Sequence, residues 1–579
     1  MNSKSLMTGG NEDIMKNLSD LGNGRFRNPI LFADYSDPDV IRVGDTYYMT
    51  ASSFNYTPGL PILISHDLVN WKLVNYALNN IQEDRYKIPR HSEGVWAPAI
   101  RYHDGMFYIY YGMPDEGYYV VRTTDPLGKW EEPICILEGK GLIDPCPFWD
   151  EDGKAYVIHG YAKSRIGFKS ILGIFELSSD GLKAISEDHF IFDGNDPQNS
   201  AVTIEGPKVY KRDGYYYVWA PAGGVKFGYQ VVLRSRDIHG PYEIKEVMHT
   251  GNTEINGPHQ GGLIDTVNGD EWFIHFQDRG LYGRICHLQP VNWHDGWPIV
   301  GVNPDENNIG EPVEEMEKPN TGISDEPSYL EASDSFEDGQ YGLMWQWLGN
   351  HSNRFYGIRD NDVSKETSQN CLRLRAINLS DESEPIIWKC SNILTQKIIY
   401  PLFRSEIGVD ATGLLPGDRA GVCMTGGQYM AAYLQREAEN KYTVRVIESY
   451  GGDSDKKEKV LGEYEFGKLC YDYGLSIEEG LKNIRFILSF ECDDKRVTSK
   501  ELYFKNVEDK DNTPILKMYL SLDDDKDLRR ALDLKVAYTP SDHTWVGAKL
   551  GLFALSCDMD KKSECEGYAD FLYADIQEI

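Results

Sequence analysis

Short runs of alternating apolar and polar residues, separated by turns that contain Gly and Asp, recur through roughly the first 310 residues. The repeats begin at Asp37, Ala97, Asp144, Glu205 and Gln260, and they read DPDVIRVGDTYYMTAS, APAIRYHDGMFYIYYG, DPCPFWDEDGKAYVIHG, EGPKVYKRDGYYYVWAPAG and QGGLIDTVNGDEWFIHFQD. A period of two predicts strands, and Asp-Gly or Gly-Asp between two such runs favours a hairpin. Each stretch therefore predicts a pair of antiparallel strands.

A second element follows several of these hairpins. It reads SHDLVNWKL from Ser65, TTDPLGKWEE from Thr123 and SRDIHGPYEI from Ser235, with a weaker copy, LSSDGLKAIS, from Leu177. A hairpin with further strands, repeated about every 45–60 residues, is typical of four-stranded blades around an axis. Five copies predict a five-bladed β-propeller. An ordinary β-sandwich would explain the strands, but it would not explain why the hairpins share one template.

The composition and the strand pattern of the sequence change after about Pro312. The stretch EPVEEMEKPNTGISDEPSYLEA is acidic and contains Pro, as linkers do. Strand-like runs return from Ser333 without the propeller template, which predicts a two-sheet sandwich. We therefore divide this all-β chain into an N-terminal extension (1–27), a propeller (28–312), a linker (313–330) and a β-sandwich (331–579).

Composition narrows the classes of partner and compartment. The chain of 579 residues is too long for a single hydrophobic core, so we expect two or more domains. Its 91 acidic and 59 basic residues give a net charge of −32. Such a charge repels nucleic acid and anionic membranes, and no apolar run is long enough for a spanning helix. The start MNSKSLMTGG has no apolar signal-peptide core, and the 10 cysteines form no CxxC pair. We therefore expect a cytoplasmic protein with reduced thiols and no zinc site, as a monomer or a homo-oligomer.

Three of the five residues that begin the repeats are acids. In a propeller the innermost strands line the axis, so Asp37, Asp144 and Glu205 would converge at one end of it, together with Ala97 and Gln260. A single acid before Pro or Gly is best explained by a turn or cap role. Three like charges brought together cost free energy, so their recurrence favours a functional interpretation.

A pair of carboxyl groups, one protonated and the other ionised, is the usual catalytic arrangement for cleaving a glycosidic bond. A third carboxylate beside the acid would raise the pKa of that acid. Phe54 and Trp96 lie beside the first residues of the repeats, where an aromatic ring can pack on the C–H face of a sugar. For each ring alone, packing in the core is the competing explanation.

These residues carry a family resemblance. NPILFADYSDPDVIRVGDTYYMTASSFNYTPGLPILISHDLVNWKLV resembles the opening of glycoside hydrolase family 43, which contains β-xylosidases, α-L-arabinofuranosidases and arabinanases. EGVWAPAI, LIDPCPFWDEDGKAYVIHG and IEGPKVYKRDGYYYV resemble its next three motifs, and NGPHQGGLIDT and YGRICHLQPVNWHDGWPIVG resemble its final blade. The resemblance covers roughly residues 28–310 and implies a five-bladed propeller and hydrolysis with inversion.

The resemblance also implies roles for single residues. Asp37 would be the general base and Glu205 the general acid, and Asp144 would adjust the pKa and position of that acid. Arg284 would contact the sugar and His259 would lie near the axis, although an ion-pair Arg and a core His are the competing explanations. Family members need no cofactor but often hold a calcium or other ion near this His, commonly through water, so His259 is also the candidate metal contact.

The second half resembles the lectin-like (concanavalin-type) sandwich of many family 43 xylosidases, through LMWQWLGN and YADFLYADIQEI. In those relatives a loop of the sandwich can form a wall of the active site. An independent sugar-binding module is the competing role, and both remain open from the sequence.

The resulting hypothesis is an inverting exo-glycosidase that releases terminal xylose or arabinofuranose from xylan- or arabinoxylan-derived oligosaccharides. Inversion predicts carboxyl groups about 6.5–9.5 Å apart. A sucrose- or fructan-active hydrolase is disfavoured because its Asn-Asp-Pro-Asn and Glu-Cys-Pro signatures are absent. An arabinan-active hydrolase and a non-catalytic carbohydrate-binding propeller are the remaining alternatives.

Overall fold

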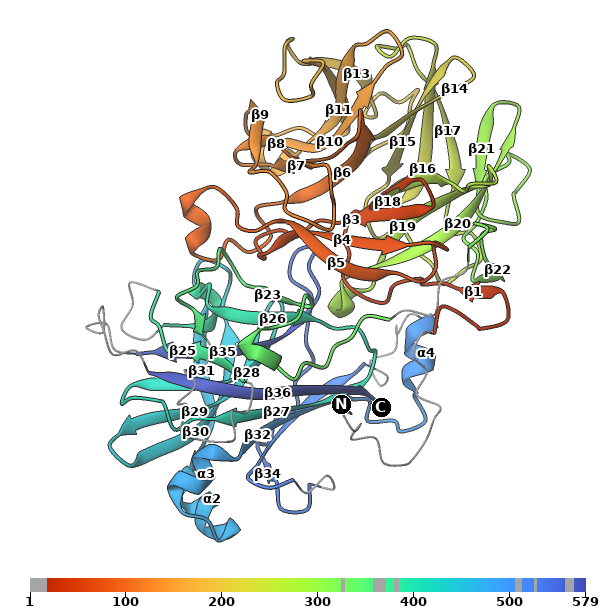
Figure 1. The fold of residues 1–579 in the computed structure, drawn as a ribbon. Coiled ribbons are helices and arrows are strands. Elements are labelled where there is room, and N and C mark those ends of the chain that lie inside the picture. The colour runs from red at the N-terminus through yellow and green to blue at the C-terminus, as the bar shows by residue number, and fades with distance from the viewer. Residues whose placement is uncertain are drawn as a thin grey trace, which may run out of the picture.

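Five four-stranded antiparallel sheets succeed one another along the first half of the chain in the computed structural model (Figure 1). The structure describes residues 18–323, 329–357, 371–379, 385–505, 513–524, 528–557 and 567–579. Each sheet is built from strands consecutive in sequence, and the innermost strand of each blade contacts the next blade around the axis. The predicted five-bladed propeller is confirmed.

The strands of the five blades have the following bounds. Blade 1 contains β2 (Asp39–Val43), β3 (Thr46–Thr50), β4 (Gly59–Ser65) and β5 (Lys72–Leu78). Blade 2 contains β6 (Trp96–His103), β7 (Met106–Met113), β8 (Gly117–Thr123) and β9 (Ile134–Glu138). Blade 3 contains β10 (Leu142–Trp149), β11 (Ala155–Tyr161), β12 (Ile171–Leu177) and β13 (His189–Asp193), with the short helix α1 (Lys163–Ile166) after β11. Blade 4 contains β14 (Lys208–Arg212), β15 (Tyr215–Ala222), β16 (Tyr229–Ser235) and β17 (Glu243–Met248). Blade 5 contains β18 (His259–Asp265), β19 (Glu271–Asp278), β20 (Arg284–His294) and β21 (Trp297–Val300).

The predicted Asp-Gly hairpins form for a local reason. At Asp104–Gly105 both residues have positive φ, 46° and 79°, and at Asp213–Gly214 the values are 51° and 73°. A type I′ turn needs positive φ at both central positions, and its twist matches that of the strands it joins. These turns fix the register of β6 with β7 and of β14 with β15.

The segment before blade 1 closes the ring by pairing with the last blade. Ile30 N donates to Cys286 O and Tyr35 N donates to Arg284 O, each at 2.9 Å. The first and last blades are therefore joined by backbone hydrogen bonds along β20, and the chain then continues directly to Asp37.

A second strand pair lies beside this closure. β1 (Arg25–Arg27) pairs antiparallel with β22 (Glu315–Glu317). β1 belongs to the range predicted as an N-terminal extension, and β22 belongs to the range predicted as a linker. Both ranges therefore contribute a strand to the body of the molecule.

Ion pairs between neighbouring blades surround the end of the axis opposite to the one at which Asp37, Asp144 and Glu205 are predicted to converge. The pairs, with their N–O distances, are Arg101–Asp39 (2.7 Å), Lys211–Asp150 (2.5 Å), Arg212–Glu271 (2.8 Å) and Arg42–Asp265 (2.5 Å). Blades 2 and 3 are joined there by His103 stacked on Trp149, with ring centroids 4.6 Å apart. Each of the five blade boundaries is thus crossed by a specific side-chain contact.

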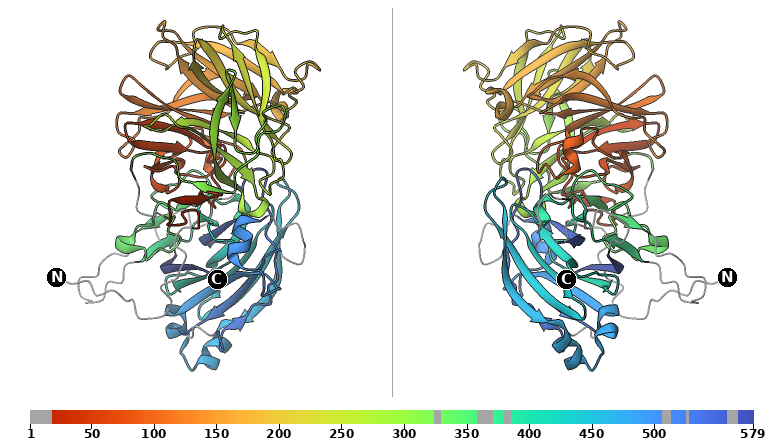
Figure 2. Two further views of the ribbon diagram at one scale, coloured as in Figure 1. Left: turned by 90° about the vertical axis from the view of Figure 1, so that its right-hand side faces the viewer. Right: turned by 90° about the vertical axis from the view of Figure 1, so that its left-hand side faces the viewer.

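The second half forms two seven-stranded antiparallel sheets packed face to face, as Figures 1 and 2 show. In spatial order, one sheet contains β23 (Trp345–Trp347), β26 (Ile393–Lys397), β35 (Lys549–Ser556), β28 (Asp418–Thr425), β29 (Met430–Ala438), β30 (Lys441–Tyr450) and β31 (Lys457–Glu465). The other contains β24 (Tyr356–Gly357), β25 (Leu372–Arg375), β36 (Tyr568–Glu578), β27 (Phe403–Asp410), β32 (Ile484–Glu491), β33 (Ile515–Ser521) and β34 (Leu532–Asp533). The predicted sandwich is confirmed.

Within the described part of the sandwich, three short α-helices connect strands: α2 (Phe466–Tyr473), α3 (Ile477–Lys482) and α4 (Ser499–Phe504). α3 and α4 each begin with a capping box, formed by Ser476 with Glu479 and by Thr498 with Glu501. Among the described residues, no helix has the length and apolar content needed to cross a membrane.

A buried charge cluster joins the propeller to the sandwich. Asp34 accepts hydrogen bonds from Arg284 N (3.0 Å) and from Gly547 N (3.1 Å), and its carboxylate lies 3.6 Å from Lys549 Nζ. Burial, together with the nearby Lys549, lowers the pKa of Lys397 to about 7, and Asp34 partly opposes this shift. One carboxylate therefore holds β20 of the propeller and two cationic residues of the sandwich.

We expect Asp34→Asn to lower the Tm of the protein. The change removes the carboxylate that faces Lys397 and Lys549 and leaves two buried ammonium groups uncompensated, which costs about 3 kcal/mol. Differential scanning calorimetry at pH 6, where Lys397 is mostly charged, measures the loss. Asp295→Asn, at an exposed turn, is the control. Equal Tm values for the Asp34 variant and the wild type would contradict the assignment.

Candidate active site

One residue at the start of each innermost strand adopts a left-handed backbone conformation. In four blades this residue is the predicted first residue of the repeat, and the φ values are 54° at Asp37, 36° at Ala97, 59° at Asp144 and 32° at Gln260. Non-Gly residues pay a strain of about 1 kcal/mol or more in this region, so the surrounding structure must hold them there. The turn aims each side chain toward the end of the axis where the strands begin.

Blade 4 departs from this pattern by one residue. Its left-handed position is Gly206, with φ 57°, and not Glu205. The strand register agrees, because Lys208 of β14 pairs with Trp219 as Asp39 of β2 pairs with Thr50. The predicted equivalence of Glu205 with Asp37 and Asp144 is therefore wrong by one position. Glu205 instead corresponds to the residue before the turn, as Ser36, Trp96 and His259 do in other blades.

Asp37 is buried and is held by three side chains. Its carboxylate accepts hydrogen bonds from Ser36 Oγ (2.8 Å), Ser52 Oγ (2.6 Å) and Arg284 Nη1 (3.0 Å). Arg284 Nη1 also donates to Ser36 Oγ at 2.8 Å, and its guanidinium lies over the ring of Phe276. These donors satisfy the carboxylate oxygens and fix their orientation. Arg284 is thus bound to Asp37 across the closure of the ring.

Asp144 has a different environment. Its side chain is buried and accepts one hydrogen bond, from Gly206 N at 2.7 Å. Burial, with repulsion from Glu205 and Asp37, raises the pKa of Asp144 to about 8, and the Gly206 N–H and the buried Lys208 partly oppose this shift. Asp144 is therefore protonated at neutral pH, and it lies within electrostatic reach of both other acids.

Glu205 is only partly buried, and its carboxylate contacts His259. His259 Nε2 lies 3.0 Å from Glu205 Oε1, and the imidazole itself is buried. Glu205 N donates to Pro221 O at 3.3 Å, which ties this residue to β15. Of the three acids, Glu205 is the most accessible from solvent. The structure therefore brings all three acids, Arg284 and His259 to one end of the axis.

Aromatic side chains from both domains form a wall beside the acids. Trp96 Nε1 donates to Ser92 O at 3.0 Å, and the Trp96 ring meets Trp545 of the sandwich edge-on, with centroids 4.7 Å apart. The guanidinium of Arg165 lies 5.3 Å from the Trp96 ring. Phe54 is buried in the same apolar cluster and makes a backbone bridge to Val95. Phe54 thus supports the wall, and Trp96 forms its centre.

The sandwich loop that reaches the propeller is a tight turn with Trp545 near its tip. His543 and Val546 exchange backbone hydrogen bonds, and Trp545 has φ 69°. His543 Nδ1 lies 2.8 Å from Ser92 Oγ, which anchors the turn to the propeller. A bulky residue held in the left-handed region often marks a functional site. The loop therefore brings Trp545 against Trp96 of the propeller, and its role as a wall of the active site stays a prediction.

A directly bound calcium ion does not fit the residues near His259. Calcium takes six to eight oxygen ligands, and within the described ranges no group of three or more His, Cys, Asp or Glu side chains could hold a metal ion. The carboxylates of Asp37 and Asp144 already accept other donors. His259 Nδ1 is buried without a hydrogen-bond partner, so it offers one nitrogen to a water molecule. An ion contacted through water remains a prediction.

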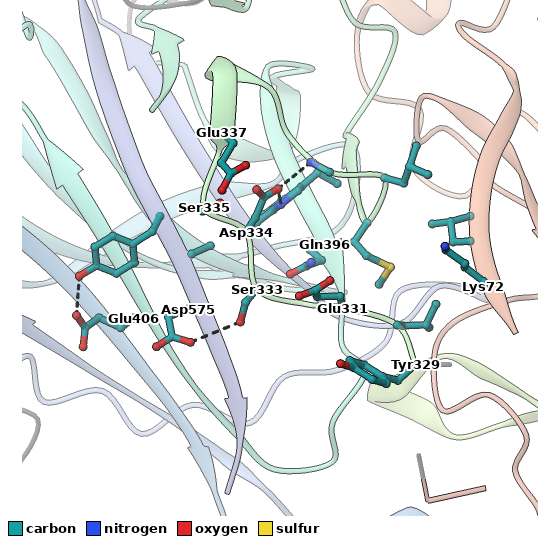
Figure 3. A pocket seen from close by; sticks show the side chains of 18 residues that line it. Lys72, Tyr329, Glu331, Ser333, Asp334, Ser335, Glu337, Gln396, Glu406 and Asp575 are labelled. Atoms are coloured by element: carbon teal, nitrogen blue, oxygen red, sulfur yellow. Dashed lines mark hydrogen bonds between the residues drawn. The ribbon is translucent and has the colours of Figure 1, made fainter. Parts of the chain in front are cut away.

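A large cavity between the domains does not contain the three acids. It has a volume of about 830 Å³ and is lined from the sandwich and from the segment that enters it, with Lys72 from the propeller (Figure 3). Its carboxyl groups include Glu406, which accepts from Tyr573 at 2.6 Å, and Asp575, which accepts from Ser333 at 3.5 Å. The pattern of paired acids with different environments belongs to the end of the axis and not to this cavity.

Sequence reasoning missed several residues that build the site. Ser36 and Ser52 hold Asp37, Lys208 acts on Asp144, and Arg165 and Trp545 contact Trp96. The position of Ser36 directly before a recurring turn could have identified it. The other four depend on contacts between blades or between domains, which leave no local pattern.

Two family models match adjoining parts of the chain. The model described as Glycosyl hydrolases family 43 matches residues 26–298. The model described as Beta xylosidase C-terminal Concanavalin A-like domain matches residues 333–577. The first match covers the propeller and the second covers the sandwich, and residues 299–332 lie between them.

Proteins of similar sequence carry related names. A putative beta-xylosidase from Xylanibacter ruminicola is 38% identical over 385 residues, which cover 66% of this chain and 68% of that protein. A beta-xylosidase from Formosa agariphila is 32% identical over 490 residues and covers 76% and 79%. A non-reducing end alpha-L-arabinofuranosidase from Bacteroides ovatus is 30% identical over 397 residues and covers 64% and 69%.

Solved structures share the arrangement of both domains. A bifunctional GH43-CE protein from Bacteroides eggerthii has a TM-score of 0.72 and 27% identity, and it covers 96% of this chain and 64% of that chain. The xylan beta-1,4-xylosidase from Bacillus halodurans has a TM-score of 0.73 and 21% identity, and it covers 95% and 100%. The similarity to the xylan beta-1,4-xylosidase supports the fold of this chain alone.

We expect Asp144→Asn to raise the Tm above pH 7 while lowering activity. Folded Asp144 keeps its proton to about pH 8, whereas an unfolded Asp loses it near pH 3.9. Between these values the folded state binds more protons, so the free energy of unfolding falls as the pH rises. Asn cannot titrate, and it still accepts from Gly206 N.

Scanning calorimetry between pH 4 and pH 8.5 checks this expectation. The Tm difference between variant and wild type should grow with pH and vanish near pH 4, and the exposed Asp104→Asn should show no such trend. A constant Tm difference across the range would contradict the pKa shift of Asp144.

Proposed function

The chain belongs to glycosyl hydrolases family 43, and from this premise we propose that it is an inverting exo-glycosidase. We propose that it releases terminal xylose or arabinofuranose units from xylan- or arabinoxylan-derived oligosaccharides. The family membership makes it a glycoside hydrolase. The observation that carries the finer proposal is the difference between the environments of the three acids, because inverting hydrolysis needs one acid and one base at a single site.

Asp37 acts as the general base in this proposal. Its carboxylate is fixed by Arg284, Ser36 and Ser52, so one oriented lone pair can accept a proton from a water molecule. The resulting hydroxide forms a bond with the anomeric carbon as the bond to the leaving oxygen breaks. This step inverts the configuration and requires carboxyl groups about 6.5–9.5 Å apart, which remains a prediction.

Glu205 acts as the general acid and gives a proton to the leaving oxygen. It is the most accessible of the three acids, and His259 orients its carboxyl group. Asp144 lies within electrostatic reach of Glu205 and is buried without a cationic partner in hydrogen-bond contact. In this proposal Asp144 is a positioning residue that acts on Glu205 electrostatically.

The aromatic wall supports removal of terminal units. Trp96 and Trp545 meet edge-on, so the sandwich limits the space beside the acids. A pocket closed on this side accepts the end of a chain more readily than its middle. The names of the similar proteins include both xylosidases and an arabinofuranosidase, and the two sugars can present similar hydroxyl groups around the scissile bond.

We also propose a cytoplasmic location, where short imported oligosaccharides would be the substrates. Cys135, Cys146, Cys286, Cys423 and Cys470 have free thiols, which is typical of a reducing compartment. Disulfide mapping of protein isolated from its native cells under alkylating conditions tests this part of the proposal.

Turnover of p-nitrophenyl β-D-xylopyranoside or p-nitrophenyl α-L-arabinofuranoside is the first expected result. The rate should fall at least a thousandfold in Asp37→Asn, because the base that activates water is removed. The two substrates are assayed side by side, and product configuration is followed by proton NMR. An arabinan-active hydrolase would instead turn over arabino-oligosaccharides, and retention of configuration would contradict the inverting mechanism.

Glu205→Gln should slow hydrolysis of xylobiose by about 10²- to 10⁴-fold, since the leaving sugar needs a proton. Aryl substrates with better leaving groups should lose less activity, and xylose binding should persist. Glu132→Gln, at an exposed acid of blade 2, is the matched control. A Glu205 variant that cleaves xylobiose at the wild-type rate would overturn the assignment.

A further inference from the structure

The loop that carries Glu205 (residues 194–207) is held on one side by a segment with an exposed phenylalanine. Lys169 Nζ donates to Thr203 Oγ1 at 3.0 Å, and Thr203 N donates to Ser170 Oγ at 2.7 Å. Phe168, directly before Lys169, is 36% exposed. This segment follows α1, whose Arg165 lies over Trp96 of the aromatic wall. It therefore links the wall to the Glu205 loop.

On its other side the same loop is held by β15 and by the loop that follows it. Gly223 N donates to Val202 O at 2.9 Å, next to the bond between Glu205 N and Pro221 O. Residues 223–228 then present Phe227, which is 77% exposed. Gly228 packs against the imidazole of His259, since a Cβ added there would lie 2.9 Å from Nδ1. Phe227 is thus one residue from a contact with the partner of Glu205.

The loop between these two segments is itself apolar at its surface. Val202 is 54% exposed and lies three residues before Glu205. The rings of Tyr161 and Phe190 contact Phe168, with centroids 5.1 Å and 5.9 Å from it, and Phe190 is itself exposed. Phe168 therefore belongs to a cluster of aromatic rings and is not an isolated side chain.

The chemistry of the proposed reaction says what passes over this surface. The general acid must touch the oxygen between the released sugar and the remainder of the chain. The released unit lies on the Asp37 side, so the remaining chain leaves past Glu205 and over its loop. Exposed rings cost free energy in water and can recover it by packing on the C–H faces of sugars.

We propose that Phe168, Val202 and Phe227 form binding subsites for the part of a neutral pentose oligosaccharide that lies beyond the first leaving sugar. This inference rests on the proposed function and adds a preference for substrate length. The enzyme would bind chains of three or more sugars better than disaccharides, although it releases one unit at a time.

Kinetics on substrates of increasing length test the proposal. For Phe227→Ala and Phe168→Ala, kcat/KM on xylohexaose should fall about three- to tenfold each, which corresponds to the range for an aromatic contact. Values on p-nitrophenyl xyloside and xylobiose should stay within twofold of the wild type. Tyr102→Ala is the matched control, because this exposed ring lies on β6 near the end of the strand that is remote from the acids.

Two outcomes would overturn the proposal: an unchanged kcat/KM on xylohexaose, or an equal loss on all three substrates. Binding of xylohexaose to Glu205→Gln, measured by calorimetry, gives a second test that does not need turnover. Adding Phe227→Ala in that background should raise the Kd for xylohexaose and leave the Kd for xylose unchanged. If the wild type cleaves neither xylose- nor arabinofuranose-based substrates and binds neither sugar, the proposed function fails. An unchanged Kd for xylohexaose in an enzyme that is active overturns only the proposed subsites.

Discussion

The buried ion pair between Asp37 and Arg284 is the interaction on which the rest of the site depends. Asp37 begins the first blade and Arg284 begins β20 of the last blade, so their 3.0 Å contact exists only when the ring is closed. A buried carboxylate without such a partner would be costly, and breaking a buried pair costs several kcal/mol. Asp34 holds Arg284 by its backbone and also holds Gly547 of the sandwich. Closure of the ring, docking of the sandwich and orientation of Asp37 are therefore one connected arrangement.

Three acids of the same chemical type acquire different properties from their neighbours. Asp37 has a guanidinium and two hydroxyl groups, Asp144 has one backbone N–H and deep burial, and Glu205 has an imidazole and access to solvent. The repeat supplies similar backbone turns, and the residues outside the repeat supply the differences. The one-residue shift of the acid in blade 4 contributes to the difference among the three environments. Gly206 takes the left-handed position there, so Glu205 lies one residue before the turn.

Much of the fold could be predicted because its signals are local. Asp-Gly turns and alternating strands occur within about 20 residues, so the hairpins and the five blades could be read from the sequence. The convergence of Asp37, Asp144 and Glu205 followed from the repeat, but the alignment of Glu205 was wrong because Gly adopts the turn conformation more readily than Glu. Ser52 and Trp545 could not be predicted, because their roles depend on segments that meet only in three dimensions. The strand pair of β1 and β22 was missed for the same reason, since each strand has only three residues and its partner lies far along the chain.

The pairing of residues 30–35 with β20 sets an order for biosynthesis. Asp34 and Arg284 are 250 residues apart, so the N-terminal segment leaves the ribosome long before its partner strand exists. During that time the growing chain has an open sheet edge and an unpaired carboxylate at Asp37, which is the kind of surface that chaperones shield. A nascent chain that ends before β20 contains all three acids but not the residue that orients Asp37. The pairing that completes the site can therefore form only after β20 has been synthesised.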